Sequence, residues 1–194
     1  SLSGTKSIAT GLTQAPEFVI TKVTTTTDDW LTFHKDLSST ESLILNGNRA
    51  KLSNAAYAHT FNSDGTISGL VVGDPNWWMS DETYVFYSWH SVPGLQKFGS
   101  YRCNGDGSGG GNENGTYVEL GFRPAMILFK GSSYTSDWTW IDDERCKVNY
   151  NDVAMRANYQ YSEIGNARGG DGSSSQPENY AVDLLSNGFK IRAS

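Results

Sequence analysis

Residues 11–22 read Gly11-Leu-Thr-Gln-Ala-Pro16-Glu-Phe18-Val19-Ile20-Thr-Lys22, and residues 28–33 read Asp28-Asp29-Trp30-Leu-Thr-Phe33. The same motif returns as Gly121-Phe-Arg-Pro124-Ala-Met126-Ile127-Leu128-Phe-Lys130, followed by Ser136-Asp137-Trp138-Thr-Trp-Ile141. Four residue types recur 108 positions apart: Pro16/Pro124, Lys22/Lys130, Asp29/Asp137 and Trp30/Trp138. Ser63-Asp-Gly65 is echoed by Ser186-Asn-Gly188, 123 positions on. A repeat of this length predicts two related halves of one β-domain, about residues 4–70 and 115–194.

Short runs of β-branched and aromatic residues alternate with Gly, Asn, Asp and Ser along the chain, which is typical of a sandwich. Strands are predicted at Phe18–Val23, Trp30–His34, Ser42–Leu45, Thr83–Trp89, Lys97–Tyr101, Thr116–Leu120, Ala125–Lys130, Trp138–Ile141, Tyr180–Leu184 and Gly188–Arg192. The segment Thr83–Trp89 has large apolar side chains on both alternations and is predicted to be a central strand. The predicted fold class is all-β, an antiparallel two-sheet sandwich of jelly-roll or lectin-like type.

The composition limits the class of protein further. A chain of 194 residues fits one undivided all-β domain, 1–194. The net charge of −6 and the pI near 5.0 argue against a nucleic-acid partner, which requires a basic surface. No run of 18 apolar residues is present, so no membrane insertion is expected. The start at Ser1, without Met, fits an excised domain or a processed product. The chain is expected to be part of a larger multidomain or virion protein.

The two cysteines, Cys103 and Cys146, lack the spacing of a zinc site. Two alternatives remain open from sequence: a disulfide in an oxidising compartment, or two separate small buried thiols.

Two glycine-rich stretches, residues 104–115 and 166–179, combine Asp, Asn and Glu side chains with exposed backbone. They are either flexible loops or calcium sites, because calcium requires six to eight oxygen ligands and glycine leaves carbonyl groups accessible. The expected donors are Asp106, Asn112, Glu113, Asp171 and Glu178, with Asn104 and Asn179 as neutral helpers. The spacing of an EF-hand is absent.

The chain has 6 Trp, 10 Tyr and 8 Phe, more than one small core requires, so some rings are expected on the surface. Trp30 and Trp138 match in the repeat and are expected in the core. Trp77 and Trp78 are adjacent, lie in a predicted loop and have no counterpart in the repeat. With Tyr161 they are the expected ligand-binding residues; loop packing is the alternative for the tryptophans.

Features of an enzyme are weak in this sequence. The histidines are His34, His59 and His90, and the motifs of a nucleophile elbow, a zinc protease and a phosphate loop are absent. The one dense acidic cluster is Asp142-Asp143-Glu144-Arg145. Neighbouring carboxylates on a strand point to opposite faces, so the cluster is expected to be a solvated turn or calcium ligands rather than an acid/base pair.

Several segments carry a resemblance to known proteins: Trp89-His90-Ser91-Val92, Lys97-Phe98-Gly99-Ser100-Tyr101, Asn104-Gly105, Gly121-Phe122-Arg123-Pro124-Ala125 and Ser186-Asn187-Gly188-Phe189-Lys190-Ile191. In them the chain resembles β-domains of structural and tail-appendage proteins of marine phages. It is also similar to ligand-binding modules of giant RTX-type adhesins of marine bacteria. The resemblance implies a jelly-roll-like sandwich, an extracellular or virion setting and binding in place of catalysis; its adhesin branch also implies calcium and recognition of peptide ends. Cys103 and the loop of residues 73–79, which is bulkier and more aromatic, depart from the phage pattern.

The function predicted from all of this is a non-enzymatic, extracellular adhesion or receptor-binding module. It would recognise a peptide or glycan on a partner cell surface with the help of calcium. The alternative is a virion structural, decoration or tail-fibre domain, and a carbohydrate-active hydrolase is the third candidate.

Overall fold

The computed structural model describes residues 5–55, 58–70, 83–104, 114–160, 163 and 181–192. The chain divides into two compact units. Unit 1 comprises Ser1–Ser91 and Gly131–Ser136, and unit 2 comprises Val92–Lys130 and Asp137–Ser194. Each unit has its own cluster of buried hydrophobic residues and is described by itself. The extent of one undivided domain over residues 1–194 stays a prediction.

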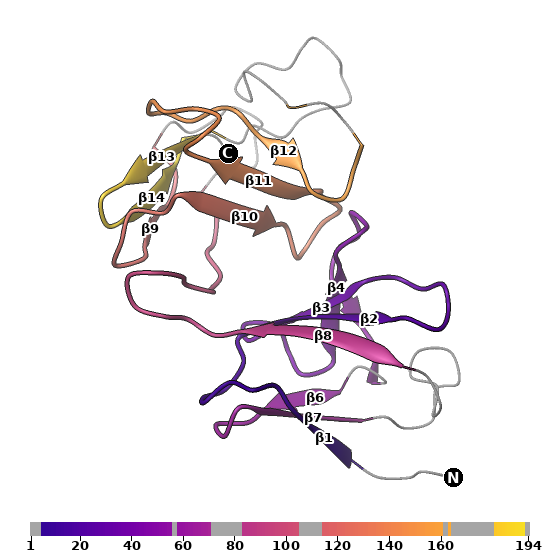
Figure 1. Cartoon of the computed structure of the whole chain (residues 1–194). Helices are drawn as coiled ribbons and strands as arrows, with labels where there is room; N and C mark the ends of the chain where they lie inside the picture. Colours follow the sequence, from indigo (N-terminus) through magenta and orange to yellow (C-terminus); the bar gives the residue numbers. More distant parts are fainter. Residues whose placement is uncertain are drawn as a thin grey trace. The chain divides into compact units, whose positions relative to one another are not determined.

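Unit 1 contains a five-stranded and a three-stranded antiparallel sheet (Figure 1). The larger sheet has the order β5-β4-β3-β2-β8, formed by β5 (Leu52–Ser53), β4 (Glu41–Ile44), β3 (Leu31–His34), β2 (Phe18–Val23) and β8 (Tyr84–Trp89). The smaller has the order β1-β7-β6, formed by β1 (Thr5–Ala9), β7 (Thr66–Leu70) and β6 (His59–Phe61). Val19 and Phe33 of the larger sheet share one buried cluster with Ile67 of the smaller, so the core lies between the two sheets.

Unit 2 contains two three-stranded antiparallel sheets. One has the order β10-β11-β12, formed by β10 (Met126–Lys130), β11 (Trp138–Asp142) and β12 (Met155–Arg156). The other has the order β13-β14-β9, formed by β13 (Val182–Leu185), β14 (Gly188–Ile191) and β9 (Tyr117–Glu119). Ile141 of the first sheet is fully buried with Leu184 and Phe189 of the second, so this core also lies between two sheets.

The sequence repeat is a structural repeat. In unit 1, Phe18 pairs with His34 and Val19 with Phe33. In unit 2, Met126 pairs with Asp142 and Ile127 with Ile141, which is the same register moved by 108 residues. The hairpin β6–β7 corresponds to β13–β14, and β1 and β9 each complete a three-stranded sheet beside the second strand of the hairpin.

A hydrogen-bonded clamp is repeated atom for atom. In unit 1, Trp30 N donates to Asn46 Oδ1 at 2.9 Å, and Asn46 Nδ2 donates to Asp29 Oδ1 at 2.9 Å. In unit 2, Trp138 N donates to Asn158 Oδ1 at 2.7 Å, and Asn158 Nδ2 donates to Asp137 Oδ1 at 2.8 Å. The recurrence of Asp-Trp is therefore explained by a shared structural role.

The prediction of an all-β antiparallel architecture with an internal repeat is confirmed. Trp138 is buried as expected, whereas Trp30 is half-buried. Two expectations about strands are wrong. The segment Thr83–Trp89 forms β8 at the edge of its sheet, where aromatic side chains lie on an accessible face. Residues Lys97–Tyr101 form no strand, and Lys97 instead donates its Nζ to Glu119 O at 2.9 Å.

Both thiols are free, so the possible disulfide is not formed. Cys103 is exposed, contrary to the expectation of a buried thiol, and Cys146 is half-buried. Among the described residues, none forms a helix long and apolar enough to cross a membrane.

Candidate functional site

The ligand-binding and metal-ligating residues predicted from sequence lie almost all outside the described residues. These are Trp77, Trp78, Tyr161, Asp106, Asn112, Glu113, Asp171, Glu178 and Asn179. Asn104 is described: it is exposed, and its Nδ2 donates to Asn114 O at 3.1 Å. Within the described ranges, no group of three or more His, Cys, Asp or Glu side chains could hold a metal ion.

A row of aromatic rings crosses one face of the five-stranded sheet. We call Phe18, His34, Tyr87 and Trp89 the aromatic row. Phe18 of β2 is paired with His34 of β3 on one side and with Trp89 of β8 on the other. Since residues directly opposite one another in a ladder share a face, the pairing places three rings side by side. Tyr87 lies two residues before Trp89, on the same face of β8.

The rings of the aromatic row are in contact along its length. Tyr87 stacks on Trp89, with ring centroids 6.2 Å apart and an angle of 17° between the planes. Trp89 and Phe18 are 5.7 Å apart, and Phe18 meets His34 edge to face at 6.2 Å. Tyr87 is 46% exposed, and the other three are half-buried. The row therefore offers an accessible aromatic surface held on paired strands.

This face differs from the face that forms the core. Val19, Thr21 and Val23 alternate with Phe18, Ile20 and Lys22 along β2, and the first three are buried. The alternation of β2 therefore directs Phe18 away from the core of unit 1.

Polar groups flank the aromatic row where its strands end. The Glu17 carboxylate accepts hydrogen bonds from the backbone N and the hydroxyl of Ser91, and lies 3.4 Å from Lys35 Nζ. Gln14 Nε2 lies 2.5 Å from His90 Nδ1. The combination of rings with adjacent hydrogen-bonding groups is suited to a ligand with both apolar and polar surfaces.

His34 has a structural hydrogen bond that depends on its protonation state. Its Nδ1 accepts a hydrogen bond from Asp36 N at 3.1 Å, which requires an unprotonated Nδ1. Burial lowers the pKa of His34 below its ordinary value of 6.5 and outweighs the opposing effect of Asp36. The ring is therefore held neutral at pH 7.

The other histidines have contacts of a different kind. His59, the first residue of β6, packs against Phe33 and Phe61 with ring centroids 4.6 and 4.8 Å away. His90 follows β8, and its Nδ1 lies 2.8 Å from Ser91 O. His34 and His90 thus have hydrogen-bonded positions at the ends of strands.

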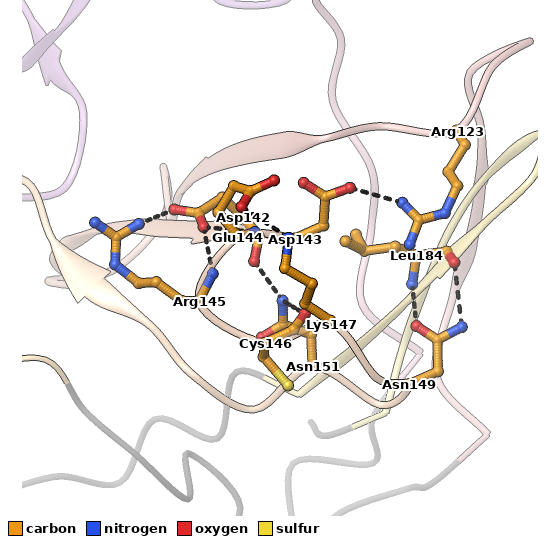
Figure 2. Close-up of polar contacts among 10 residues, drawn as sticks. All are labelled: Arg123, Asp142, Asp143, Glu144, Arg145, Cys146, Lys147, Asn149, Asn151 and Leu184. Carbon is orange, nitrogen blue, oxygen red and sulfur yellow. Dashed lines mark hydrogen bonds and ion pairs between the residues drawn. The ribbon is translucent and has the colours of Figure 1, made fainter.

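The acidic cluster of unit 2 forms hydrogen bonds and ion pairs with neighbouring groups of the chain (Figure 2). Asp142 is buried, and its carboxylate accepts hydrogen bonds from Trp140 Nε1 at 2.8 Å and from Glu144 N and Arg145 N at 3.1 and 3.0 Å. The Arg145 guanidinium pairs with the same carboxylate. Asp142 thus ends β11 by binding the turn that follows it.

The neighbouring acidic side chains each pair with a cation. Asp143 accepts a hydrogen bond from Arg123 Nη1 at 3.0 Å, and Glu144 accepts one from Lys147 Nζ at 2.8 Å, which raises the pKa of Lys147. Figure 2 shows these partners around the turn. Each acidic side chain of this turn is therefore paired with a cation of the chain itself.

Two asparagines fix the segment that follows. Asn151 is fully buried; its Nδ2 donates to Asp142 O at 2.6 Å and its Oδ1 accepts from Val153 N at 3.1 Å. Asn149 bonds both backbone groups of Leu184 in β13, at 3.0 and 3.1 Å. Neither role was predicted from sequence: Leu184 lies 35 residues from Asn149, and the bonds of Asn151 depend on the conformation of the turn.

Comparison with known proteins identifies the family but no named relative. No curated protein matches the chain, and no solved structure matches it. A family profile matches over residues 1–194, the whole of the sequence. The chain belongs to the DUF7483 family, a domain of unknown function.

Proposed function

We propose that this chain is a non-enzymatic recognition module that binds a peptide or glycan of a partner surface through the aromatic row. The observation that carries the proposal is the contact of four rings across three paired strands, with Tyr87 46% exposed. Aromatic faces stack on sugar rings and on apolar peptide side chains, and the amphipathic rings of Tyr and Trp are well suited to such surfaces. Because the strands hold the rings in place, little ordering entropy is lost on binding.

The acidic turn supports binding over catalysis. A glycoside hydrolase needs two carboxyl groups facing one substrate. In the turn of unit 2, Asp142, Asp143 and Glu144 are each engaged by a cation of the chain. We therefore rank the hydrolase below the recognition module.

The setting that we propose is extracellular, on a cell surface or a virion surface, as part of a larger protein. The resemblance to adhesin and phage-appendage domains and the net charge of −6 support it. Calcium is the proposed cofactor, held by Asp106, Asn112, Glu113, Asp171 and Glu178. A virion structural, decoration or tail-fibre domain is the alternative, which a symmetric oligomer burying Trp77 and Trp78 would favour.

The proposal is tested by glycan and peptide arrays, probed with the wild-type chain with and without a chelator. Tyr87→Ala is the test variant. Tyr117→Ala is its matched control, because Tyr117 is also 46% exposed and also lies on the edge strand of a sheet. Tyr87→Ala is expected to lose about tenfold or more in affinity for any ligand found, with Tyr117→Ala unchanged. Equal affinity of both variants and wild type would remove the aromatic row as the ligand surface.

A further inference from the structure

The two copies differ in what lies beside their first long strand. In unit 1, β2 lies between β3 and β8, and all six of its residues are paired with β8. In unit 2, β10 is the counterpart of β2 and pairs with β11 in the same register. The other edge of β10 has no strand beside it in the part of the chain that the structure describes.

The backbone of β10 shows which groups face this edge. In an antiparallel ladder, alternate residues direct both N–H and C=O to the same neighbouring strand. Asp143 N donates to Ala125 O, so the odd-numbered residues of β10 face β11. Met126 and Leu128 therefore direct their backbone groups to the open edge. The same rule in unit 1 directs Phe18 and Ile20 to β8, where Trp89 and Tyr87 are their partners.

The core of unit 2 is less covered at this edge than the core of unit 1. Val19 and Thr21 of β2 are 1% and 2% exposed. Their counterparts Ile127 and Phe129 pack against the buried cluster of unit 2 but are only half-buried. Met126, the counterpart of Phe18, is 46% exposed. An edge strand with apolar side chains and free backbone groups readily pairs with another chain.

We infer that the edge of β10 binds an extended segment of a partner polypeptide as an added antiparallel strand, in the register in which β8 pairs with β2. Strand addition of this kind is a general mode of peptide recognition, in which main-chain bonds give affinity and alternate side chains give specificity. The inference goes beyond the proposed function, because it concerns a separate surface and does not use the aromatic row.

The strand β8 indicates the chemistry of the partner segment. Phe86 lies opposite Thr21 on the core side and packs against the core of unit 1, and Ser88 lies opposite Val19. A segment on β10 would place the corresponding side chains beside Ile127 and beside Phe129, whose ring also contacts that of Tyr101 edge to face at 6.0 Å. In unit 1 the strand that covers the edge of β2 is β8, whose sequence is unlike that of β2. The repeat therefore favours a different polypeptide as the partner of β10, with large apolar residues at alternate positions, over a second copy of β10.

The probe for the test is a fluorescein-labelled synthetic peptide with the sequence of residues 83–89, Thr-Tyr-Val-Phe-Tyr-Ser-Trp. Backbone hydrogen exchange in the full chain is measured with and without the peptide. In the free chain, Met126 and Leu128 are expected to exchange fast, while Ile127 and Phe129, bonded to β11, exchange slowly. The peptide is expected to bind saturably and to slow Met126 and Leu128.

Two N-methylated peptides separate strand pairing from nonspecific adhesion. N-methylation at the Tyr87 position removes a donor that faces the paired strand, and at the Phe86 position it removes one that faces away. The first is expected to bind about tenfold more weakly or worse, and the second like the parent. Equal binding of the two peptides would overturn the inference.

A protein variant gives an independent test. Leu128→Pro removes the outward N–H, a position where an edge strand tolerates proline, and Leu128→Ala keeps it. Loss of peptide binding is expected for the proline variant alone. Both variants are expected to bind any ligand that the arrays identify for the aromatic row with the affinity of the wild type. Failure of this inference and failure of the proposed function are therefore distinguishable. If Leu128→Pro does not fold, the comparison of the two N-methylated peptides still tests whether the peptide pairs with β10 as a strand.

Two further outcomes would also overturn the inference. Slow exchange at Met126 and Leu128 in a free monomer would mean that the chain itself covers the edge. Slow exchange that appears only with a dimer in sedimentation velocity would assign the edge to a second copy.

Discussion

At the scale of single residues, His34 and Asp142 show how one role is filled by two chemistries. The two positions are 108 residues apart in the repeat, and each ends its strand. His34 Nδ1 accepts a hydrogen bond from the backbone N of Asp36, two residues further along the chain, at 3.1 Å. Asp142 Oδ1 accepts a hydrogen bond from the backbone N of Glu144, also two residues further along and also at 3.1 Å. Both copies thus have a side-chain hydrogen-bond acceptor at the start of the turn. Only the acceptor of the first copy, the His34 ring, changes its protonation state near neutral pH.

The lowered pKa of His34 predicts a pH dependence of stability. The folded state disfavours the protonated ring, so the stabilisation is complete above the unfolded pKa of about 6.5 and is lost as the pH falls through the lower folded pKa. The melting temperature of the wild type is expected to fall between pH 7 and 5. His34→Asn keeps an acceptor oxygen and does not titrate, so part of this fall is expected to disappear. Parallel melting curves of the two proteins against pH would contradict the prediction.

The clamp of Asp, Trp and Asn gives a matched pair of substitutions. Asn46 is exposed, whereas Asn158 is half-buried and bonds the buried Asp137, which also pairs with Arg156 Nη1 at 2.5 Å. Loss of a buried partner leaves a polar group unsatisfied, which costs about 1–3 kcal/mol. Asn158→Ala is therefore expected to lower the free energy of unfolding by about 2 kcal/mol, and Asn46→Ala by about half as much. Urea titrations of both variants measure the difference. An equal loss in the free energy of unfolding would show that burial does not determine how much the clamp stabilises each unit.

At the scale of elements, the turn between β6 and β7 depends on Gly65. Its φ is +81°, and a Cβ at this position would lie 1.9 Å from Leu12 O. Gly94 has a similar φ of +77°, but a Cβ there would meet nothing within 4 Å. Gly94→Ala is expected to cost about 1 kcal/mol from backbone conformation alone. Gly65→Ala is expected to cost clearly more, because the backbone of residue 12 must move. Thermal melting compares the two, and equal midpoints would contradict the clash.

Strands rich in large apolar residues could be predicted from sequence, and strands of small and polar residues could not. The alternation of β2 and the apolar runs of β10 and β11 identify these strands without tertiary information. The strands β1, β5, β6, β7 and β12 were missed, because small and polar residues such as Thr66 and Ser68 become strands only through their partners. The repeat was visible as spacing, but the position of β8 at a sheet edge depends on pairing that periodicity does not contain.

The aromatic row was beyond sequence reasoning for the same reason. Phe18 and Trp89 are paired in the sheet but far apart in the chain, and His34 joins them through a third strand. The surplus of aromatic residues correctly indicated rings on the surface, such as Tyr87 and Tyr117. The register of the paired strands determines which of these rings lie side by side. The role of the acidic turn likewise depends on Arg123 and Arg145 as partners.

At the scale of the whole molecule, the repeat separates shared scaffold from features found in one copy. Both units keep the register of the first hairpin, the clamp and a core between two sheets. Among the described residues, β8 with its part of the aromatic row belongs only to unit 1, and the open edge of β10 only to unit 2. Divergence between copies is expected where selection acts on binding rather than on folding, so these two features are the places to look for ligands.

Calcium is expected to stabilise the folded chain through its glycine-rich stretches. Residues 104–115 and 166–179 are rich in glycine, which loses more conformational entropy on ordering than any other residue. A cation bound by Asp106, Asn112, Glu113, Asp171 and Glu178 would offset that loss only in the folded state, and would raise the melting temperature by mass action.

Differential scanning calorimetry of the wild type in millimolar calcium and in chelator measures this effect. A higher midpoint in calcium is expected, with no such gain in a variant carrying Asp106→Asn, Glu113→Gln, Asp171→Asn and Glu178→Gln. These substitutions remove charge and keep size, so a variant that melts like the wild type in chelator controls for damage to the fold. The prediction is wrong if calcium leaves the melting temperature of the wild type unchanged and equilibrium dialysis shows no bound calcium. Both stretches would then be loops without a metal.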